Sequence, residues 1–334
     1  MNAPGGTGLP VSVVGWGSAV PEGRLSNADL EARVDTNDTW IVERTGIRER
    51  RIAAPNETAA TLGALAGADA IKRAGLTPAD IDLLVVATET PDQLLPHTGA
   101  FLSEALGLHC GSFDISAACA GFVYELVVGA SLMFAGYDHV LIVGSETLSR
   151  ITDPEDRGTV ILFGDGAAAA VLARSSDSRG LLGWDLGCDG SGAGLIGIPS
   201  GGGREPASVE TIAARGHYMK MQGQEVFRRA VRAVAESSTL TLERAGVEIA
   251  DVAWFVPHQA NLRIIEAAAK RLGFEAERTI TNIERYGNTS SASIPLALFE
   301  AVEDGRVQDG DLVLCAGVGA GLTWGSALLR WGPA

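Results

Sequence analysis

The sequence has few of the residues and segments that mark secreted, disulfide-linked or metal-binding proteins. Its 334 residues include only four cysteines and five histidines. The cysteines form no C-x-x-C pair, and they show no metal-type spacing with the histidines. No apolar run reaches about 18 residues, and the opening segment MNAPGGTGLP lacks the basic and apolar regions of a signal peptide. These absences predict a cytoplasmic protein with reduced thiols, no metal ion and no membrane insertion.

Aromatic residues are scarce, and basic residues are outnumbered by acidic ones. Aromatics make up 6% of the chain although hydrophobic residues make up 46%. The core must therefore come mainly from Ala, Val, Leu and Ile, as in folds whose strands are buried on both faces. The 26 Lys and Arg against 41 Asp and Glu give a formal net charge of −15, which would repel nucleic acid. We predict a globular protein with a large core that does not bind nucleic acid.

Apolar runs of strand length alternate with helical stretches along the chain. These runs begin near Leu83, His139, Ala167, Trp254, Asp311 and Gly325. A helix is predicted from Thr58 to Ala74, because this Ala-rich segment ends at Gly75 and a Thr-Pro pair follows. The alternation predicts an α/β fold with stacked, mostly parallel sheets.

The second part of the chain repeats the order of the first. ADIDLLVVATET, GSFDISAACAGF and DHVLIVGSE are followed later by IADVAWFVPHQA, TITNIERYGNTSSAS and GDLVLCAG. We interpret this as an internal duplication, with halves at residues 1–180 and 181–334 and a Gly/Ser-rich loop from Asp189 to Arg204 near the junction. The alternative is chance similarity, because strand and helix alternation produces look-alike segments.

Cys119 lies where a strand is predicted to end and a long helix to begin, in DISAACAGFVYELVVGA. Free N–H groups and the dipole at a helix N-terminus favour an anion, so we expect a lowered thiol pKa and an available thiolate. The small neighbours Ala118, Ala120 and Gly121 leave room for a substrate. From residue type alone, the alternative is a small buried apolar side chain, and this is how we interpret the other three cysteines.

His258 and Asn288 are the other candidates for chemistry. His258 follows the apolar run WFVP, where Pro257 ends strand pairing, and ligands bind at that edge of α/β sheets. Asn288 precedes a Thr-Ser-Ser run typical of a helix cap, and a turn or cap residue is its alternative interpretation. If the halves are duplicated, matched elements meet at a pseudo-twofold axis, and Cys119, His258 and Asn288 can converge on one site.

Several long motifs resemble those of a known family. DISAACAGF, VPHQANLRII, YGNTSSASIP and GVGAGLTWGSALLRW, together with VDTNDTWIVERTGIRERRIAAPNET and TDPEDRGTVILFGDGA, resemble β-ketoacyl-acyl-carrier-protein synthase III. The similarity runs from about Val11 to Trp331, in the family's order. The resemblance implies a five-layer αβαβα thiolase-like fold built from two duplicated halves, a homodimer, and a catalytic triad of Cys119, His258 and Asn288.

The family's activity implied by the resemblance fits these residue types. A cysteine thiolate would attack a short acyl-CoA and form an acyl-enzyme. Loss of CO₂ from malonyl-acyl-carrier protein would then supply the carbanion, so no metal or other cofactor is expected. His258 and Asn288 would hold the enolate oxygen, and the backbone N–H groups of Cys119 and the Gly319-Ala320 turn would form the oxyanion hole. The product would be a 3-oxoacyl-carrier protein that initiates fatty acid synthesis.

The resemblance also implies two binding regions. The residues expected near CoA are Thr36, Trp40, Arg44, Arg157 and Asn261. Trp40 and Arg157 would stack on the adenine, since an aromatic face and a guanidinium plane suit stacking. The residues expected to meet the acyl-carrier protein are Gln259, Ala260, Asn261, Leu262 and Arg263.

Charge and pocket size add two expectations. Carrier proteins are acidic, so this acidic chain needs a local basic face. The candidates are Arg263, Lys270 and Arg271 near one predicted helix and Arg228, Arg229 and Arg232 on another. Leu95 stands where well-known members carry a phenylalanine that reaches across the dimer into the primer pocket, so primers longer than acetyl are expected. Ala320 replaces a glycine of many relatives, which changes little because only its N–H is required.

Two alternatives stay open at this point, a related acyltransferase and a non-catalytic scaffold, whereas the sequence favours neither a thiolase nor an elongating synthase. A related acyltransferase of polyketide or other secondary metabolism would use the same triad with another primer or nucleophile. Thiolases need a second catalytic cysteine, and elongating synthases need a histidine where Asn288 stands. A non-catalytic dimeric scaffold would keep the fold but lose the nucleophile.

Overall fold

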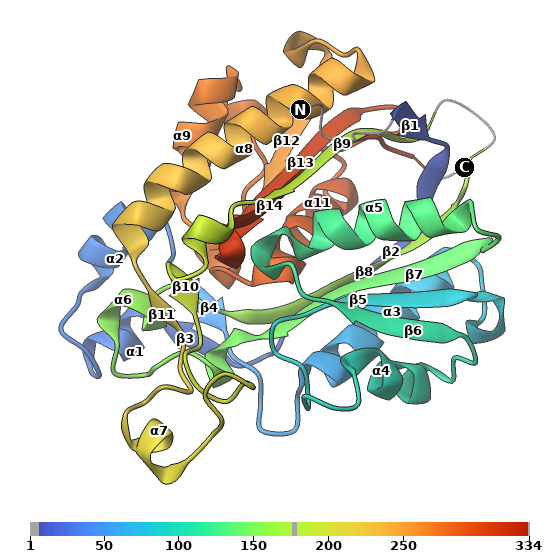
Figure 1. Ribbon diagram of the computed structural model, residues 1–334. Coiled ribbons are helices and arrows are strands. Elements are labelled where there is room, and N and C mark those ends of the chain that lie inside the picture. Colours follow the sequence, from blue (N-terminus) through green and yellow to red (C-terminus); the bar gives the residue numbers. More distant parts are fainter. Residues whose placement is uncertain (1–6, 176–178, 333–334) are drawn as a thin grey trace.

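The computed structural model describes residues 7–175 and 179–332, which form two five-stranded sheets with helices outside and between them (Figure 1). The first sheet has the strand order β2 (Val11–Ala19), β8 (Asp165–Arg174), β7 (His139–Thr147), β5 (Leu83–Ala87) and β6 (Gly111–Ile115). The second has the order β1 (Thr7–Leu9), β9 (Gly180–Cys188), β14 (Thr323–Arg330), β13 (Leu312–Gly319) and β12 (Trp254–Pro257).

The sheets are mixed, so the prediction of mostly parallel sheets is wrong. β5 runs parallel to β6 and β7, and β12 runs parallel to β13. The other neighbours in these two sheets pair antiparallel. A turn at residues 320–322 joins β13 to β14, and the segment between β7 and β8 contains only short helices, so neither connection is a long crossover helix. An apolar run indicates that a strand is buried but not its direction.

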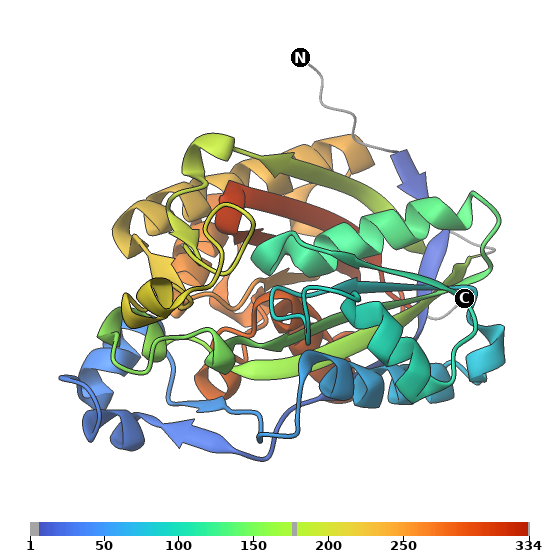
Figure 2. The ribbon, with the colours of Figure 1, turned by 60° about the horizontal axis from the view of Figure 1, so that its bottom comes forward.

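The helices complete five layers, as predicted (Figures 1 and 2). α3 (Ala59–Arg73) and α4 (Thr98–Leu106) cover the outer face of the first sheet. α5 (Gly121–Met133) and α11 (Ser293–Glu303) lie between the sheets, and most of their residues are buried. α8 (Gly223–Ala245) and α9 (Leu262–Leu272) cover the second sheet. Thr58 caps α3 and Ala74 ends it, which confirms that predicted helix.

The two central helices begin in the same way, in agreement with duplicated halves. Short 3₁₀ turns, Ala118–Ala120 and Ser290–Ala292, precede α5 and α11, and the first residue of each turn has a φ of 47°. The predicted boundary at residue 180 coincides with the start of β9, although β1 from the N-terminal half joins the second sheet. The boundary itself remains a prediction.

Short elements complete the fold near one end of the sheets. They are β3 (Arg24–Ser26), α1 (Asn27–Glu31), α2 (Asp38–Thr45), β4 (Glu49–Arg51), α6 (Arg157–Val160), β10 (Ile196–Gly197), α7 (Val209–Ala213), β11 (Lys220–Met221) and α10 (Ile283–Tyr286). The predicted Gly/Ser-rich loop thus contains β10, which pairs with β11. None of the helices in residues 7–175 and 179–332 is both long and apolar enough to span a bilayer.

Candidate active site

A cavity of about 950 Å³ opens where the short elements meet the ends of both sheets. Its wall includes Cys119, His258 and Asn288, so the structure brings the three predicted residues to one space. Leu148, Phe163, Ile196 and Met219 line it with apolar surface. Its size and mixed lining suit a ligand with a long apolar or pantetheine-like part.

Cys119 sits in the turn between β6 and α5, as predicted. A Cβ at Gly319 would lie 2.4 Å from the Cys119 backbone nitrogen, so only glycine lets β13 approach Cys119 this closely. Gly319 and Ala320 also line the cavity, beside the Cys119 amide. Cys119, Gly319 and Ala320 thus all line the same cavity, and their role as oxyanion donors stays a prediction.

The predicted lowering of the Cys119 pKa is wrong. The pKa of the thiol is raised to about 12: burial raises it most, the nearby Glu146 and Glu89 carboxylates also raise it, and a hydrogen bond with Ser290 opposes them. The helix N-terminus favours a thiolate, but desolvation and two acidic neighbours oppose it. The resting Cys119 side chain is therefore a thiol.

His258 follows β12 and is buried, with 4% of its surface exposed. Its Nδ1 lies 2.6 Å from Ser293 Oγ at the start of α11, and that oxygen accepts the Gln259 N–H at 3.3 Å. The Ser293 hydroxyl can donate to Nδ1 while it accepts this amide, and in that arrangement the ring proton is on Nε2. Burial lowers the pKa of His258 to about 3, so the imidazole is neutral.

Asn288 is oriented by its own turn. Its Oδ1 accepts the Ser290 N–H at 2.9 Å, and its backbone pairs with Leu162 and Gly164. With the oxygen occupied, Nδ2 is the donor that the side chain can offer to the cavity. His258 and Asn288 can thus present two N–H donors to an oxygen carrying negative charge.

Four of the five predicted CoA residues are linked by contacts around Trp40 on α2, and Thr36 is not among them. The guanidinium carbons of Arg44 and Arg157 each lie 4.8 Å from the Trp40 ring centroid. Arg44 lines the cavity, and so does Gly158, which follows Arg157. Asn261 also lines it, caps α9 through the Arg263 N–H, and donates to the Arg44 carbonyl at 2.9 Å. Thr36 keeps a buried hydroxyl without a hydrogen-bond partner. An adenine stacked on Trp40 would have to displace one arginine from the ring.

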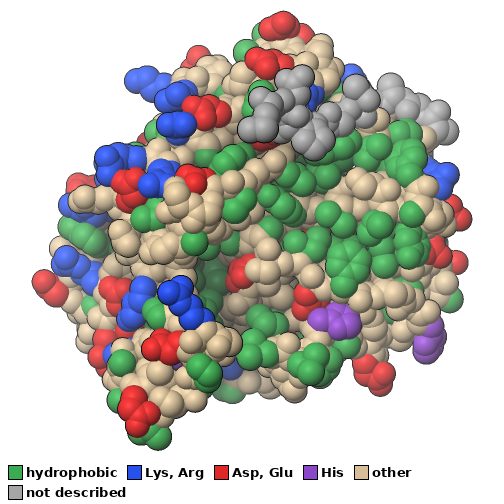
Figure 3. Space-filling view, in the orientation of Figure 1, with side chains coloured by type: hydrophobic (Ala, Val, Ile, Leu, Met, Phe, Trp, Pro, Cys, Tyr) green, Lys and Arg blue, Asp and Glu red, His purple; other side chains and the backbone are tan. Residues whose placement is uncertain are grey.

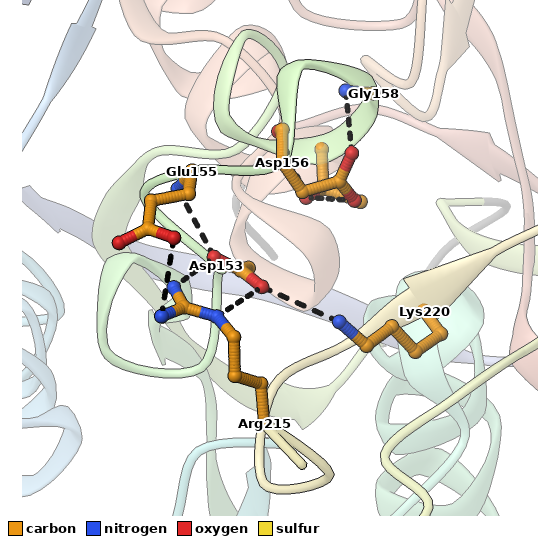
Figure 4. Close-up of polar contacts among 7 residues, drawn as sticks. Asp153, Glu155, Asp156, Gly158, Arg215 and Lys220 are labelled. Carbon is orange, nitrogen blue, oxygen red and sulfur yellow. Dashed lines mark hydrogen bonds and ion pairs between the residues drawn. The ribbon is translucent and has the colours of Figure 1, made fainter. Parts of the chain in front are cut away.

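The segment that carries Arg157 is held by an ion-pair network (Figure 4). Asp153 accepts from Arg215 and, at 3.3 Å, from Lys220 on β11, and its Oδ1 accepts the Glu155 N–H at 3.0 Å. Arg215 holds the pKa of the Asp153 carboxyl well below its usual range. The Asp156 side chain then caps α6 through the Gly158 N–H. These contacts connect the Arg157 segment to β11.

The predicted carrier-binding segment is only partly at the surface. Gln259 is fully buried, and its side-chain amide has its partners inside the protein. Nε2 donates to the carbonyls of Pro257 and Ile280, and Oε1 accepts the Asn282 N–H. It is therefore not available for docking. Leu262 packs against Gly46, whereas Arg263 is exposed.

Leu95 lies outside the cavity wall, with 84% of its surface exposed on the loop before α4. It therefore does not touch the primer space of its own chain.

Four further residues contact this site, and the sequence reasoning missed their roles. They are Glu89, Glu146, Ser290 and Ser293. The Thr-Ser-Ser run predicts only a helix cap, and nothing local marks a glutamate at a strand end as a partner of the turns 290–293. Within residues 7–175 and 179–332, no group of three or more His, Cys, Asp or Glu side chains could hold a metal ion.

The chain is similar to known proteins over nearly all its length. The family model for 3-oxoacyl-[acyl-carrier-protein (ACP)] synthase III matches residues 113–190, and the model for the C-terminal part of that family matches residues 242–331. The β-ketoacyl-[acyl-carrier-protein] synthase III of Symbiobacterium thermophilum is 51% identical over 97% of this chain and 98% of its own.

Solved structures are similar as well. The β-ketoacyl-[acyl carrier protein] synthase III from Thermus thermophilus is 44% identical, with a TM-score of 0.89 over 97% of this chain and 100% of its own. The priming β-ketosynthase from the R1128 polyketide biosynthetic pathway is 38% identical, with a TM-score of 0.90 over 100% of this chain and 99% of its own.

Proposed function

Because the chain belongs to the β-ketoacyl-acyl-carrier-protein synthase III family, we propose that Cys119, His258 and Asn288 perform the family's decarboxylative condensation. The enzyme is an acyltransferase that joins an acyl-CoA primer to malonyl-acyl-carrier protein and initiates fatty acid synthesis. The convergence of the three side chains on one cavity carries the assignment of residues.

In the first half-reaction, the Cys119 sulfur attacks the thioester carbon of the acyl-CoA. The oxygen of the tetrahedral intermediate points to the backbone N–H groups of Cys119 and the Gly319-Ala320 turn. The sulfur of CoA leaves and, in net, receives the thiol proton. Because the pKa of Cys119 is raised to about 12, this proton leaves during the attack rather than before it.

In the second half-reaction, malonyl-acyl-carrier protein occupies the same cavity. Its carboxylate leaves as CO₂, and the bonding electrons form an enolate whose oxygen accepts from His258 Nε2 and Asn288 Nδ2. The enolate carbon then bonds to the acyl carbon, and Cys119 departs as a thiolate that takes up one proton. The low pKa of His258, about 3, keeps the ring a neutral donor throughout.

Mass spectrometry of the intact protein tests this proposal. Incubation with acetyl-CoA adds one acetyl group, which peptide mapping locates on Cys119, and Cys119→Ala removes the adduct. His258→Ala and Asn288→Ala keep the adduct but lose malonyl decarboxylation by about 10²–10³-fold. Equal loss of both half-reactions would assign His258 and Asn288 to folding or binding instead.

A second candidate function is priming of a secondary pathway. It is favoured by the 38% identity to the R1128 priming ketosynthase and by the exposed Leu95 in place of a larger side chain. A panel of acyl-CoA primers with malonyl-acyl-carrier protein separates the two. A preference for short primers supports fatty acid initiation, and a preference for longer or unusual primers supports the secondary pathway.

We also propose that the enzyme works as a cytoplasmic homodimer. All four cysteines are free thiols, as a reducing compartment maintains them. β6 is an edge strand of the first sheet, and Leu94 and Leu95 expose 85% and 84% of their surface nearby in the chain. Apolar side chains gather around α5 on the face shown in Figure 3. An unpaired edge and exposed apolar residues are what a partner subunit covers.

A further inference from the structure

Glu89 is the one acidic residue among the described residues that line the cavity. It lies on the loop after β5, half-buried, in a wall whose other polar residues near Cys119 include His258, Asn288 and Ser290, none of them acidic. A carboxylate in such a place is costly unless its oxygens have partners. Its contacts show what it does there.

The Glu89 carboxylate holds the turn that presents the nucleophile. Oε1 accepts the Ala118 N–H at 2.7 Å and the Ser116 hydroxyl at 2.9 Å, and Oε2 lies 3.0 Å from the same hydroxyl. Ala118 has a φ of 47°, a left-handed conformation unusual for a residue with a Cβ. The next residue is Cys119, so the orientation of its amide and sulfur depends on this conformation.

Glu89 is itself anchored by a second carboxylate. Its N–H donates to Glu146 Oε2 at 3.0 Å, and the Thr90 hydroxyl donates to the same oxygen at 2.9 Å. Glu146 Oε1 accepts the Ser291 hydroxyl at 2.8 Å. Ser290, next to Ser291, hydrogen-bonds the Cys119 thiol. The contacts therefore run from one side of the nucleophile to the other through both glutamates.

We propose that Glu89 is a positioning residue for the nucleophile: its carboxylate fixes the turn at Ala118 and keeps a negative charge beside the Cys119 thiol. The inference rests on the proposed role of Cys119. The ionisable groups that face this thiol are Glu89 from the loop after β5, Glu146 from β7 and His258 from the end of β12.

The charge of Glu89 has a definite effect on the thiol. Carboxylates at positions 89 and 146 disfavour a thiolate, whereas His258 is neutral and adds no charge. The cationic side chains that line the cavity are Arg44, Arg228 and Arg263, and they come from α2, α8 and α9. Removal of the Glu89 charge therefore eases ionisation of Cys119, whereas removal of its hydrogen bonds loosens the turn.

Two substitutions separate the effect of the Glu89 charge from the effect of its hydrogen bonds to the turn. Glu89→Gln keeps an oxygen for the Ala118 N–H but removes the charge, and Glu89→Ala removes both. We expect iodoacetamide to alkylate Cys119 in both variants with a pH midpoint lower than in the unchanged enzyme, by about half a pH unit or more. We expect acylation by acetyl-CoA to slow by about tenfold or more in Glu89→Ala, and to stay within about twofold of the unchanged enzyme in Glu89→Gln.

The measurements are peptide-mapped alkylation against pH and single-turnover acylation followed by mass spectrometry. Glu57→Ala is the matched control, because Glu57 also accepts a backbone N–H at 2.7 Å, from Ala54, but does not line the cavity. An unmoved alkylation midpoint in Glu89→Gln would overturn the charge effect, even if Glu89→Ala did not fold. Acylation equally fast or equally slow in both variants would overturn the positioning role. An unchanged enzyme acylated elsewhere than Cys119 would instead refute the proposed function.

Discussion

The donor in the second half-reaction depends on one hydroxyl behind His258. Ser293 Oγ lies 2.6 Å from Nδ1 and is itself buried, so water cannot replace it easily. Ser293 accepts the Gln259 N–H and can at the same time donate its own hydroxyl proton to Nδ1. In that arrangement the proton of neutral His258 is on Nε2, and we expect the hydroxyl to favour this tautomer.

Ser293→Ala should impair decarboxylation but not acylation. Without the hydroxyl, Nδ1 loses its donor, and the tautomer with a proton on Nδ1 becomes populated. We expect malonyl decarboxylation to fall by about tenfold or more, while the acetyl adduct on Cys119 forms at the original rate. Nitrogen NMR of labelled histidine reports the tautomer directly. An unchanged His258 spectrum together with slower decarboxylation would point to a packing effect.

Burial of neutral His258 predicts a pH-dependent contribution to stability. The pKa is about 3 in the folded protein against a reference of 6.5, so between these values the unfolded chain binds a proton that the folded chain does not. Stability from this group is present above pH 6.5 and is lost as the pH falls, at a limiting slope of about 1.4 kcal/mol per pH unit.

Denaturant unfolding of wild type and His258→Gln across this range measures that contribution. Glu146 acts in the opposite direction, because burial raises its pKa from 4.5 to about 7, and its contribution is lost as the pH rises between these values. The difference between the two proteins cancels Glu146 and isolates His258. A difference that does not change with pH would mean that folded His258 titrates normally.

At the scale of elements, α8 and α9 bring basic residues to the cavity. Arg263 and Arg228 line it, and Arg263 lies 5.8 Å from the Phe227 ring without an ion pair to any other described residue. Arg228 pairs with Glu225, and Arg232 pairs with Glu236. The basic cluster on α8 is thus partly neutralised within its own helix, which leaves Arg263 as the stronger candidate for an acidic partner.

Arg263→Glu should weaken use of the carrier protein more than Arg232→Glu does. Both arginines are exposed, but only Arg263 combines a place at the cavity with no acidic partner. We expect the KM for malonyl-acyl-carrier protein to rise by about three- to tenfold, with a smaller salt dependence, and acylation by acyl-CoA to change little. Steady-state kinetics at two salt concentrations measure this. Equal effects of both variants would move the docking face toward α8.

The predicted adenine site pairs Trp40 on α2 with Arg157 on α6, and its test also belongs to this scale. Trp40→Ala and Arg157→Ala should each raise the KM for acyl-CoA by about three- to tenfold, because each removes one stacking face. A truncated acyl-pantetheine lacks the adenine and should respond to neither change. Kinetics with both substrates provide the comparison. An identical response to the two substrates would place the adenine elsewhere.

The positions of the strands and of Cys119, His258 and Asn288 were predictable from the sequence. The strand directions and the contacts around these residues were not. The apolar runs of β5, β7 and β13 are strong local signals, whereas their directions depend on connections that a run does not encode. The motif predicts the position of Cys119 but not the sign of its pKa shift, because burial of the thiol and the approach of Glu146, 27 positions away, arise only in the fold. Ser293 and His258 are 35 positions apart for the same reason.

At the scale of the whole molecule, Leu95 has no contact with the cavity of its own chain. It is exposed, and it lies outside the cavity wall. If the homodimer forms through the β6 edge, the loop of one subunit can reach the primer space of the other. Leu94→Glu with Leu95→Glu should then yield monomers in analytical ultracentrifugation, since buried charges oppose association. Val209→Glu, at a residue 81% exposed on α7, is the control and should stay dimeric.

Primer length tests whether Leu95 acts across the dimer. Leu95→Phe should shorten the primers accepted, because a larger side chain fills the space beside the acyl chain. Mixed dimers with one active site locate the effect. With Cys119→Ala and Leu95→Phe on the same chain and an unchanged partner, the working site receives the substituted side chain and should reject long primers.

With Cys119→Ala on one chain and Leu95→Phe on the other, the working site receives an unchanged Leu95 and should accept long primers. Competition between acetyl-CoA and longer acyl-CoAs measures both dimers. The opposite pattern would place Leu95 in the pocket of its own subunit, and no difference between the dimers would remove it from primer selection.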